Sequence, residues 1–215
     1  MRSLLIVLCF AMATLSGCVW STNPLSDPEE STVDEDLCGV WAHTTDGRID
    51  GYTIVGRPDA GKLPPGAMVM HIFDVGERKK IATQPAPFVF FISKLGNHEY
   101  WNLIAHPEPI DHRSRPSLGK FDFDKWLQHA EHGFLFCRVE RNKDALSVFH
   151  PDPEVTAKAV ENGKLKGKVD RNSKKIPELS VHLSDSTANL QKFFATDAAK
   201  DLFQKMSDHT YKRLR

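Results

Sequence analysis

The feature that most constrains the fold is a series of short runs rich in β-branched and aromatic residues, recurring about every ten residues. The segments between them carry Gly, Pro, Asn and Asp, which favour turns. We therefore expect strands at Gly39–Thr45, Tyr52–Val55, Met68–Val75, Phe88–Ser93, Tyr100–Ala105, Phe134–Val139 and Leu146–His150. Such a string predicts a mainly β fold, in which an antiparallel sheet closes into a barrel or folds into a sandwich.

After these runs the pattern changes to helix. Asp152 has the chemistry of an N-cap and Pro153 suits the first helical position, so we expect a helix near 153–162 that ends at Gly163. Two further strands are expected at Leu165–Val169 and Leu179–Leu183. A helical stripe follows, made of Leu190, Phe193, Phe194, Ala198, Leu202, Phe203 and Met206. It predicts C-terminal helices packed on the barrel.

Gly39-Val40-Trp41, at the start of the first expected strand, resembles the Gly-x-Trp motif of the lipocalin family. In that family the glycine permits a tight start to the strand and the tryptophan closes the base of the barrel. The resemblance implies a lipocalin-like barrel with an arginine against Trp41, for which Arg138 is a candidate. The family's Thr-Asp-Tyr motif is missing from this sequence.

The pattern of the first residues is typical of an export signal. Arg2 is followed by an apolar run from Leu4 to Leu15, which is shorter than the roughly 20 residues that a membrane-spanning helix needs. Leu15-Ser16-Gly17-Cys18 resembles the lipobox of bacterial lipoproteins. That resemblance implies removal of residues 1–17, diacylglycerol on the Cys18 sulfur, acylation of the new amino group with a palmitate-like chain, and attachment to a lipid bilayer. Val19, rather than Asp, follows the cysteine and favours an outer membrane over an inner one.

Residues 18–36 are expected to be the lipidated cysteine and a flexible tether. Six acids and no base lie between positions 19 and 36, together with Pro24 and Pro28 and few large apolar groups. Such a composition buries too little surface to offset the entropy of ordering. The remaining residues, 37–215, are expected to form one β-rich domain.

Charge argues against one class of partner. The chain has 28 bases and 28 acids, and removing residues 1–36 takes away one base and six acids, so the domain carries a small basic excess. This excess is spread along the sequence instead of forming a concentrated stripe, and we therefore expect no nucleic-acid partner. No cofactor motif stands out, and we expect none.

Two cysteines fall inside the expected domain. Export would place Cys38 and Cys137 in a compartment where disulfides persist. Either they are joined, or each is a buried thiol on its own strand, since the spacing alone does not decide between the two.

The ten histidines raise a metal hypothesis. His129 and His132 are three residues apart and can share a helix face, with Glu131 between them. A metal site requires further converging ligands, and a third ligand such as His98 is not placed by the sequence. A metal-dependent envelope enzyme is therefore the alternative function.

The leading expectation is a non-enzymatic lipoprotein of the bacterial cell envelope. Its barrel would bind an apolar small molecule in a cavity lined by Trp41, Tyr100, Phe134 and Phe136. If the barrel is filled instead, it would bind an envelope protein through loops such as 106–118.

Overall fold

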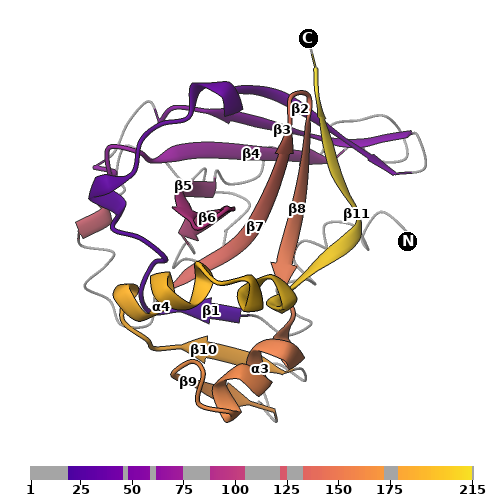
Figure 1. Ribbon diagram of the computed structural model, residues 1–215. Coiled ribbons are helices and arrows are strands. Elements are labelled where there is room, and N and C mark those ends of the chain that lie inside the picture. Colours follow the sequence, from indigo (N-terminus) through magenta and orange to yellow (C-terminus); the bar gives the residue numbers. More distant parts are fainter. Residues whose placement is uncertain are drawn as a thin grey trace, which may run out of the picture.

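Eight antiparallel strands close into a barrel, which confirms the expected fold class. The computed structural model describes residues 19–45, 48–58, 62–74, 88–104, 122–124, 133–171 and 179–214, and Figure 1 shows their arrangement. The barrel strands are β2 (Gly39–Thr45), β3 (Arg48–Gly56), β4 (Met68–Asp74), β5 (Phe88–Leu95), β6 (His98–Ile104), β7 (Phe134–Asn142), β8 (Ala145–Pro151) and β11 (Phe203–Arg213). All seven strands expected before residue 151 are present.

The strands follow one another as a meander, and the barrel has two different ends. Neighbours in sequence pair from β2 to β8, and β11 lies between β8 and β2. We call the end that carries the short turns 96–97 and 143–144 the turn end. Gly96 makes one of these turns with φ +58°, where a Cβ would lie 2.7 Å from the carbonyl oxygen of Ala195. We call the opposite end, where β4 and β6 finish and β5 and β7 start, the loop end.

Closure depends on the last strand, which the sequence did not reveal. The helical stripe predicts helix through Met206, but the helix ends before Phe203 and β11 begins there. Tyr211 to Arg213 pair with His43 to Trp41 on β2, so the C-terminal strand joins the first strand and completes the barrel.

Arg213, and not Arg138, is the arginine that packs against Trp41. Its guanidinium lies 5.6 Å from the centroid of the Trp41 ring, and its Nη2 donates to the carbonyl oxygen of Cys38 at 2.8 Å. Trp41 Nε1 donates to the carbonyl oxygen of Leu37 at 2.9 Å. Arg138 lies on the outer face of the barrel, over the ring of Phe149 at 4.0 Å. The expectation for Arg138 is wrong because sequence spacing does not reveal which strands meet at closure.

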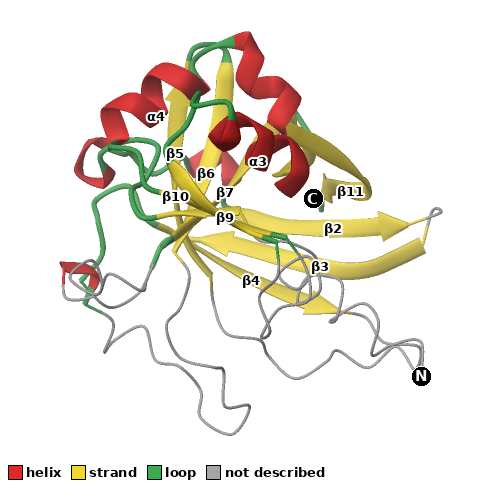
Figure 2. Cartoon of the chain, turned by 90° about the horizontal axis from the view of Figure 1, so that it is seen from below, coloured by secondary structure: helices red, strands yellow, loops and turns green. Residues whose placement is uncertain are grey.

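The helices form a layer on one outer face of the barrel (Figure 2). They are α3 (Pro153–Glu161), α4 (Thr187–Phe194) and a 3-10 helix, η4 (Asp197–Leu202). Asp152 caps α3 as expected, since its Oδ1 accepts from Val155 N at 3.0 Å. The ring centroid of Phe194 lies 5.5 Å from that of Tyr100 and 5.4 Å from that of Phe136, and these contacts hold α4 on the barrel wall.

Three short strands extend the sheet beyond β7, and we call them the side sheet. They are β1 (Val19–Ser21), β10 (Ser180–Leu183) and β9 (Gly167–Asp170). β1 is antiparallel to β7 and parallel to β10, which is antiparallel to β9. The strands expected at 165–169 and 179–183 thus exist, but they lie outside the barrel.

The N-terminal segment is ordered, which corrects the expected tether. Besides β1 it contains η1 (Pro28–Glu30) and η2 (Glu35–Leu37). Leu25 and Leu37 are fully buried, and Leu25 N donates to Oδ1 of the buried Asn102 at 2.8 Å. Residues 19–37 are therefore part of the folded domain. The composition argument fails because it averages over the segment, whereas a few apolar residues, each with its own contact on the barrel, offset the entropy of ordering.

We predict that Arg213→Ala lowers the free energy of unfolding by about 2 kcal/mol, because it removes both the cation–π contact and a charge-assisted hydrogen bond. Urea unfolding followed by tryptophan fluorescence measures this change. Arg48→Ala is the matched control, since Arg48 is exposed and its loss should cost less than about 0.5 kcal/mol. Equal losses for the two variants would show that the Arg213 contacts do not stabilise closure.

Candidate functional site

The barrel interior is lined with apolar side chains. Because side chains alternate along a strand, every second residue points inward, and the inward residues of neighbouring strands form one buried cluster. Its buried members are Leu37, Trp41, Val55, Met68, Met70, Phe90, Ile92, Trp101, Leu103, Cys137, Val139 and Leu146. Phe90 and Trp101 stack with their ring centroids 4.6 Å apart. We call this set the interior cluster.

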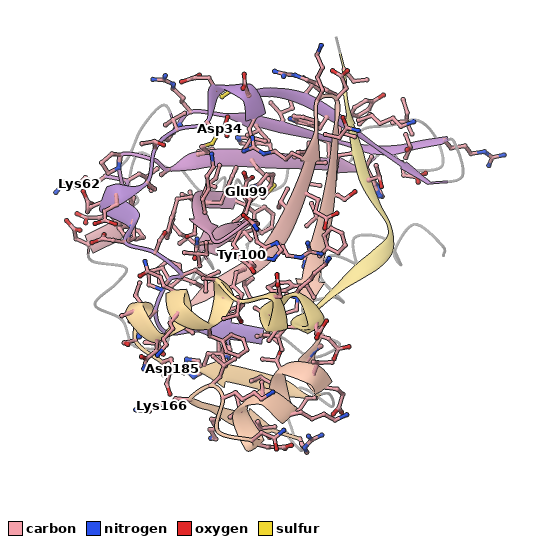
Figure 3. The ribbon with its side chains drawn as sticks, viewed as in Figure 1. Asp34, Lys62, Glu99, Tyr100, Lys166 and Asp185 are labelled. Atoms are coloured by element: carbon pink, nitrogen blue, oxygen red, sulfur yellow. The ribbon has the colours of Figure 1, made fainter. Side chains whose placement is uncertain are left out.

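A charged network closes the interior at the turn end. Arg141 Nη1 lies 2.8 Å from Asp34 Oδ2 and Nη2 bonds to Glu99, while Trp101 Nε1 donates to Glu99 Oε1 at 3.0 Å. Figure 3 shows Asp34 above Glu99 in the upper half of the molecule. The side chains of Asp34 and Glu99 are 19% and 12% exposed. The pairing compensates for the partial loss of hydration and joins the N-terminal segment to β6 and β7.

Three partly exposed apolar residues adjoin the interior cluster at the loop end. Ile72, Phe88 and Leu135 pack against the interior cluster but remain partly exposed. Ile72 is near the end of β4, Phe88 begins β5, and Leu135 is the second residue of β7. Leu135 pairs directly with Leu103, and Phe88 with Met70. An apolar wall therefore continues from the buried cluster to the loop end.

Only one of the four aromatic residues expected to line a cavity lies in the interior. Trp41 belongs to the interior cluster, whereas Tyr100 and Phe136 belong to the cluster beneath the helices and Phe134 to a third cluster with Phe91. The expected lining is wrong for these three. Alternation gives two faces, but when both faces are covered the sequence does not tell which face is inside.

Tyr100 and Asn102 instead form hydrogen bonds to other parts of the chain on the outer face of the barrel. Tyr100 Oη donates to the carbonyl oxygen of Phe194 at 3.0 Å, and burial raises the pKa of Tyr100 to about 12. Asn102 donates to Ser93 Oγ at 2.7 Å and accepts from Leu25. Their role is structural, and no single sequence signal separates such residues from ligand-lining ones.

Cys38 and Cys137 are free thiols in the structure, and both contact the interior cluster. Burial raises the pKa of Cys137 to about 12. Burial and the nearby Glu35 carboxylate raise the pKa of Cys38. Both thiols are therefore held in the protonated form at neutral pH.

A metal centre is not found among the described residues, where no group of three or more His, Cys, Asp or Glu side chains converges. His129, Glu131 and His132 lie outside the described residues, as does the loop 106–118. His98 Nε2 lies 3.9 Å from Asp197 Oδ1, at the junction of β6 and the helical layer. The histidine hypothesis stays a prediction.

A polar surface groove of about 520 Å³ lies between the N-terminal segment and the turn end of β5. It is lined by residues 26–27 and 30–36, by residues 92–95 and by Gln191. Its walls carry five acids and Lys94. The groove is polar and continuous with the surface, so it does not suit an apolar ligand.

The fold defines the class: a lipocalin-like, eight-stranded antiparallel β-barrel with a helical layer on one face. Within the described part of the chain, no helix has the length and apolar character to cross a bilayer. Comparisons with protein-family models, with curated proteins and with solved structures give no significant match.

We predict that Cys137 is not alkylated in the folded protein, and that Cys38 reacts more slowly than a free thiol. At pH 8, a pKa of about 12 leaves about one Cys137 in 10,000 as the reactive thiolate. Iodoacetamide labelling followed by peptide mass spectrometry, with and without urea, measures both sites.

The raised pKa of Cys137 also makes the stability of the folded protein depend on pH. The unfolded thiol ionises near its ordinary pKa of 9.0, so the contribution of Cys137 to stability is complete below pH 9 and is lost as the pH rises towards 12. Labelling of Cys137 at the same rate with and without urea, or a disulfide between Cys38 and Cys137, would contradict this description.

Proposed function

We propose that this chain is a lipid-anchored protein of the bacterial cell envelope whose barrel binds an apolar small molecule. The anchor is supported by the sequence: a positive start, a short apolar run, and the lipobox-like Leu15-Ser16-Gly17-Cys18. Acylation of Cys18 with two or more chains would hold the protein stably at a bilayer without a spanning helix. Val19 after the cysteine favours the outer membrane where the host has one.

Ligand binding rests on one observation, the apolar lining of the barrel interior, which continues to partly exposed apolar residues at the loop end. The Arg141 network and the Trp41–Arg213 contact lie at the turn end, and Ile72, Phe88 and Leu135 are partly exposed at the loop end. An eight-stranded barrel has room for side chains or for one small ligand. A flat or elongated apolar molecule that inserts between these three side chains would reach the interior cluster.

The residues favour binding over chemistry. The interior cluster consists of aliphatic, aromatic and thioether side chains and one thiol, Cys137, whose raised pKa keeps it protonated. Such a lining provides shape and apolar contact but no acid–base pair for a reaction. The first alternative is that an envelope protein, and not a small molecule, binds at the loop end. The second alternative is that the protein is a metal-dependent enzyme that uses His129 and His132.

We predict that Ile72→Gln weakens binding of a fluorescent fatty acid at least about tenfold, because a polar amide replaces apolar contact surface. Ile54→Gln is the matched control: Ile54 is on the neighbouring strand, points outward and is 42% exposed. Fluorescence titration measures the affinity of each variant. The same fatty acid should also appear as added mass in native mass spectrometry.

Equal affinities for the two variants would contradict binding in the interior. Failure of the wild-type protein to bind would overturn the ligand proposal and leave the envelope protein as occupant. Copurified zinc, lost from the His129→Ala/His132→Ala variant, would favour the enzyme.

We predict that Cys18→Ser releases the protein from the membrane fraction, because no acyl chain is attached. Cys38→Ser is the matched control and should remain in that fraction. Fractionation followed by immunoblotting measures the distribution. Retention of Cys18→Ser in the membrane fraction would show that a lipid on this cysteine is not the anchor.

A further inference from the structure

The folded domain starts directly after the proposed lipid site. Val19 is 5% exposed and pairs with Val181 of β10, and Ser21 is fully buried and pairs with Leu183. Consecutive Cα atoms are about 3.8 Å apart. A lipid on Cys18 would therefore hold β1 at the bilayer surface, with no flexible spacer to let the domain rotate freely.

The outer side of the side sheet presents an aromatic ring at this position. Trp20 is 36% exposed, and its ring centroid lies 5.1 Å from that of His182. Trp20, His182 and Lys168 are directly opposite one another across β1, β10 and β9, so their side chains share one face. His182 Nε2 lies 2.9 Å from Thr22 Oγ1. We call this surface the Trp20 face.

Lys168 of the Trp20 face is preceded by two further exposed lysines just before β9. Lys164, Lys166 and Lys168 are exposed and alternate with the buried Leu165 and with Gly167. Figure 3 shows Lys166 at the outer edge of the side sheet, beside Asp185.

Three of the four acids near this edge form other contacts. Asp185 is buried and accepts from the backbone N of Lys166 at 2.5 Å. Asp170 is half-buried and adds one carboxylate to β9. Arg171 is paired with Glu154 and Glu161 of α3. Burial and the positive charge of Lys168 lower the pKa of His182, so this imidazole is neutral at neutral pH. The edge thus combines a neutral aromatic pair with three exposed lysines, none of which forms an ion pair with another described residue.

The Trp20 face also adjoins the loop end of the barrel. Trp20 pairs directly with Leu135 of β7, and Leu135 is partly exposed and packs against the interior cluster at that end. The β7–β8 turn and the C-terminus lie at the opposite end of the molecule (Figure 1). A surface that contacts the Trp20 face would therefore be near the loop end and far from the turn end.

We propose that the Trp20 face is a membrane-docking surface for anionic phospholipid headgroups, which orients the barrel with its loop end towards the bilayer. The proposal rests on the lipidation of Cys18. Tryptophan partitions to the headgroup region, where its ring is buried and its N–H is hydrated, and lysines gain energy from anionic lipids within a Debye length. An apolar ligand would then pass between bilayer and barrel over Trp20 and Leu135, with little exposure to water.

Lysine footprinting on the lipidated full-length product in vesicles tests the orientation. The protein is reconstituted in phosphatidylglycerol–phosphatidylcholine vesicles, treated briefly with an acetylating reagent, and digested for mass spectrometry. Lys164, Lys166 and Lys168 should be acetylated about fivefold more slowly in vesicles than in detergent micelles. Lys143, exposed in the β7–β8 turn, is the internal control and should react equally in both.

Each result supports or overturns the proposal. If the rate of acetylation in vesicles relative to detergent is the same for Lys168 as for Lys143, the docking proposal is overturned and the lipid anchor stays intact. Protection of Lys168 that is equal in pure phosphatidylcholine overturns the anionic preference. Protection already present in detergent overturns it too, because the chain itself would then cover the lysine. If intact mass shows no acyl chains on Cys18, the docking proposal and the anchor fall together.

A second readout follows Trp20 itself. Brominated lipids quench tryptophans in the headgroup region, and Trp20→Phe should remove most of the emission that they quench. The quenched emission should be unchanged in Lys143→Glu. Equal quenching in the wild type and Trp20→Phe would overturn the contact of Trp20 with lipid.

Discussion

The structure depends on the closure of the sheet by its last strand. β11 pairs with β2, and at this seam Arg213 lies over Trp41 and donates to the carbonyl oxygen of Cys38. Without β11, β2 and β8 would each present an unpaired edge, which exposes backbone groups that promote aggregation. Closure removes these edges and encloses the interior cluster. Because the contact joins the two ends of the domain, the C-terminal residues are as important for the barrel as its first strand.

The barrel wall separates two apolar regions with different roles. The inner region is the interior cluster, with the charged pairs of Arg141 at the turn end. The outer region holds α4, η4 and the side sheet on the wall through Tyr100, Phe136 and Phe149. Ligand binding is proposed for the inner region because the outer one is already covered by the chain. This division also explains why Tyr100 is fully buried and yet does not face the interior.

The N-terminal segment connects the proposed anchor to the barrel. It contributes β1 to the side sheet, Leu25 to the outer face and Asp34 to the Arg141 network before β2 begins. A position next to Cys18 is thereby coupled to both ends of the barrel. If the protein is lipidated there, the bilayer becomes a close neighbour of the domain, and the proposed docking would turn the loop end towards it.

The sequence by itself determined the strand-rich class, the seven strands before residue 151 and the capped helix that follows Asp152, because these features follow from local residue preferences. It also contains the whole case for the lipid anchor. Only the tertiary structure decided that β11 closes the barrel, that Arg213 rather than Arg138 meets Trp41, and that residues 19–37 are ordered. It alone decided that Trp41 faces inward while Tyr100, Phe134 and Phe136 do not. These outcomes depend on contacts between residues far apart in the chain and on which face of each strand is enclosed. The alternation of residues along a single strand reveals neither of these.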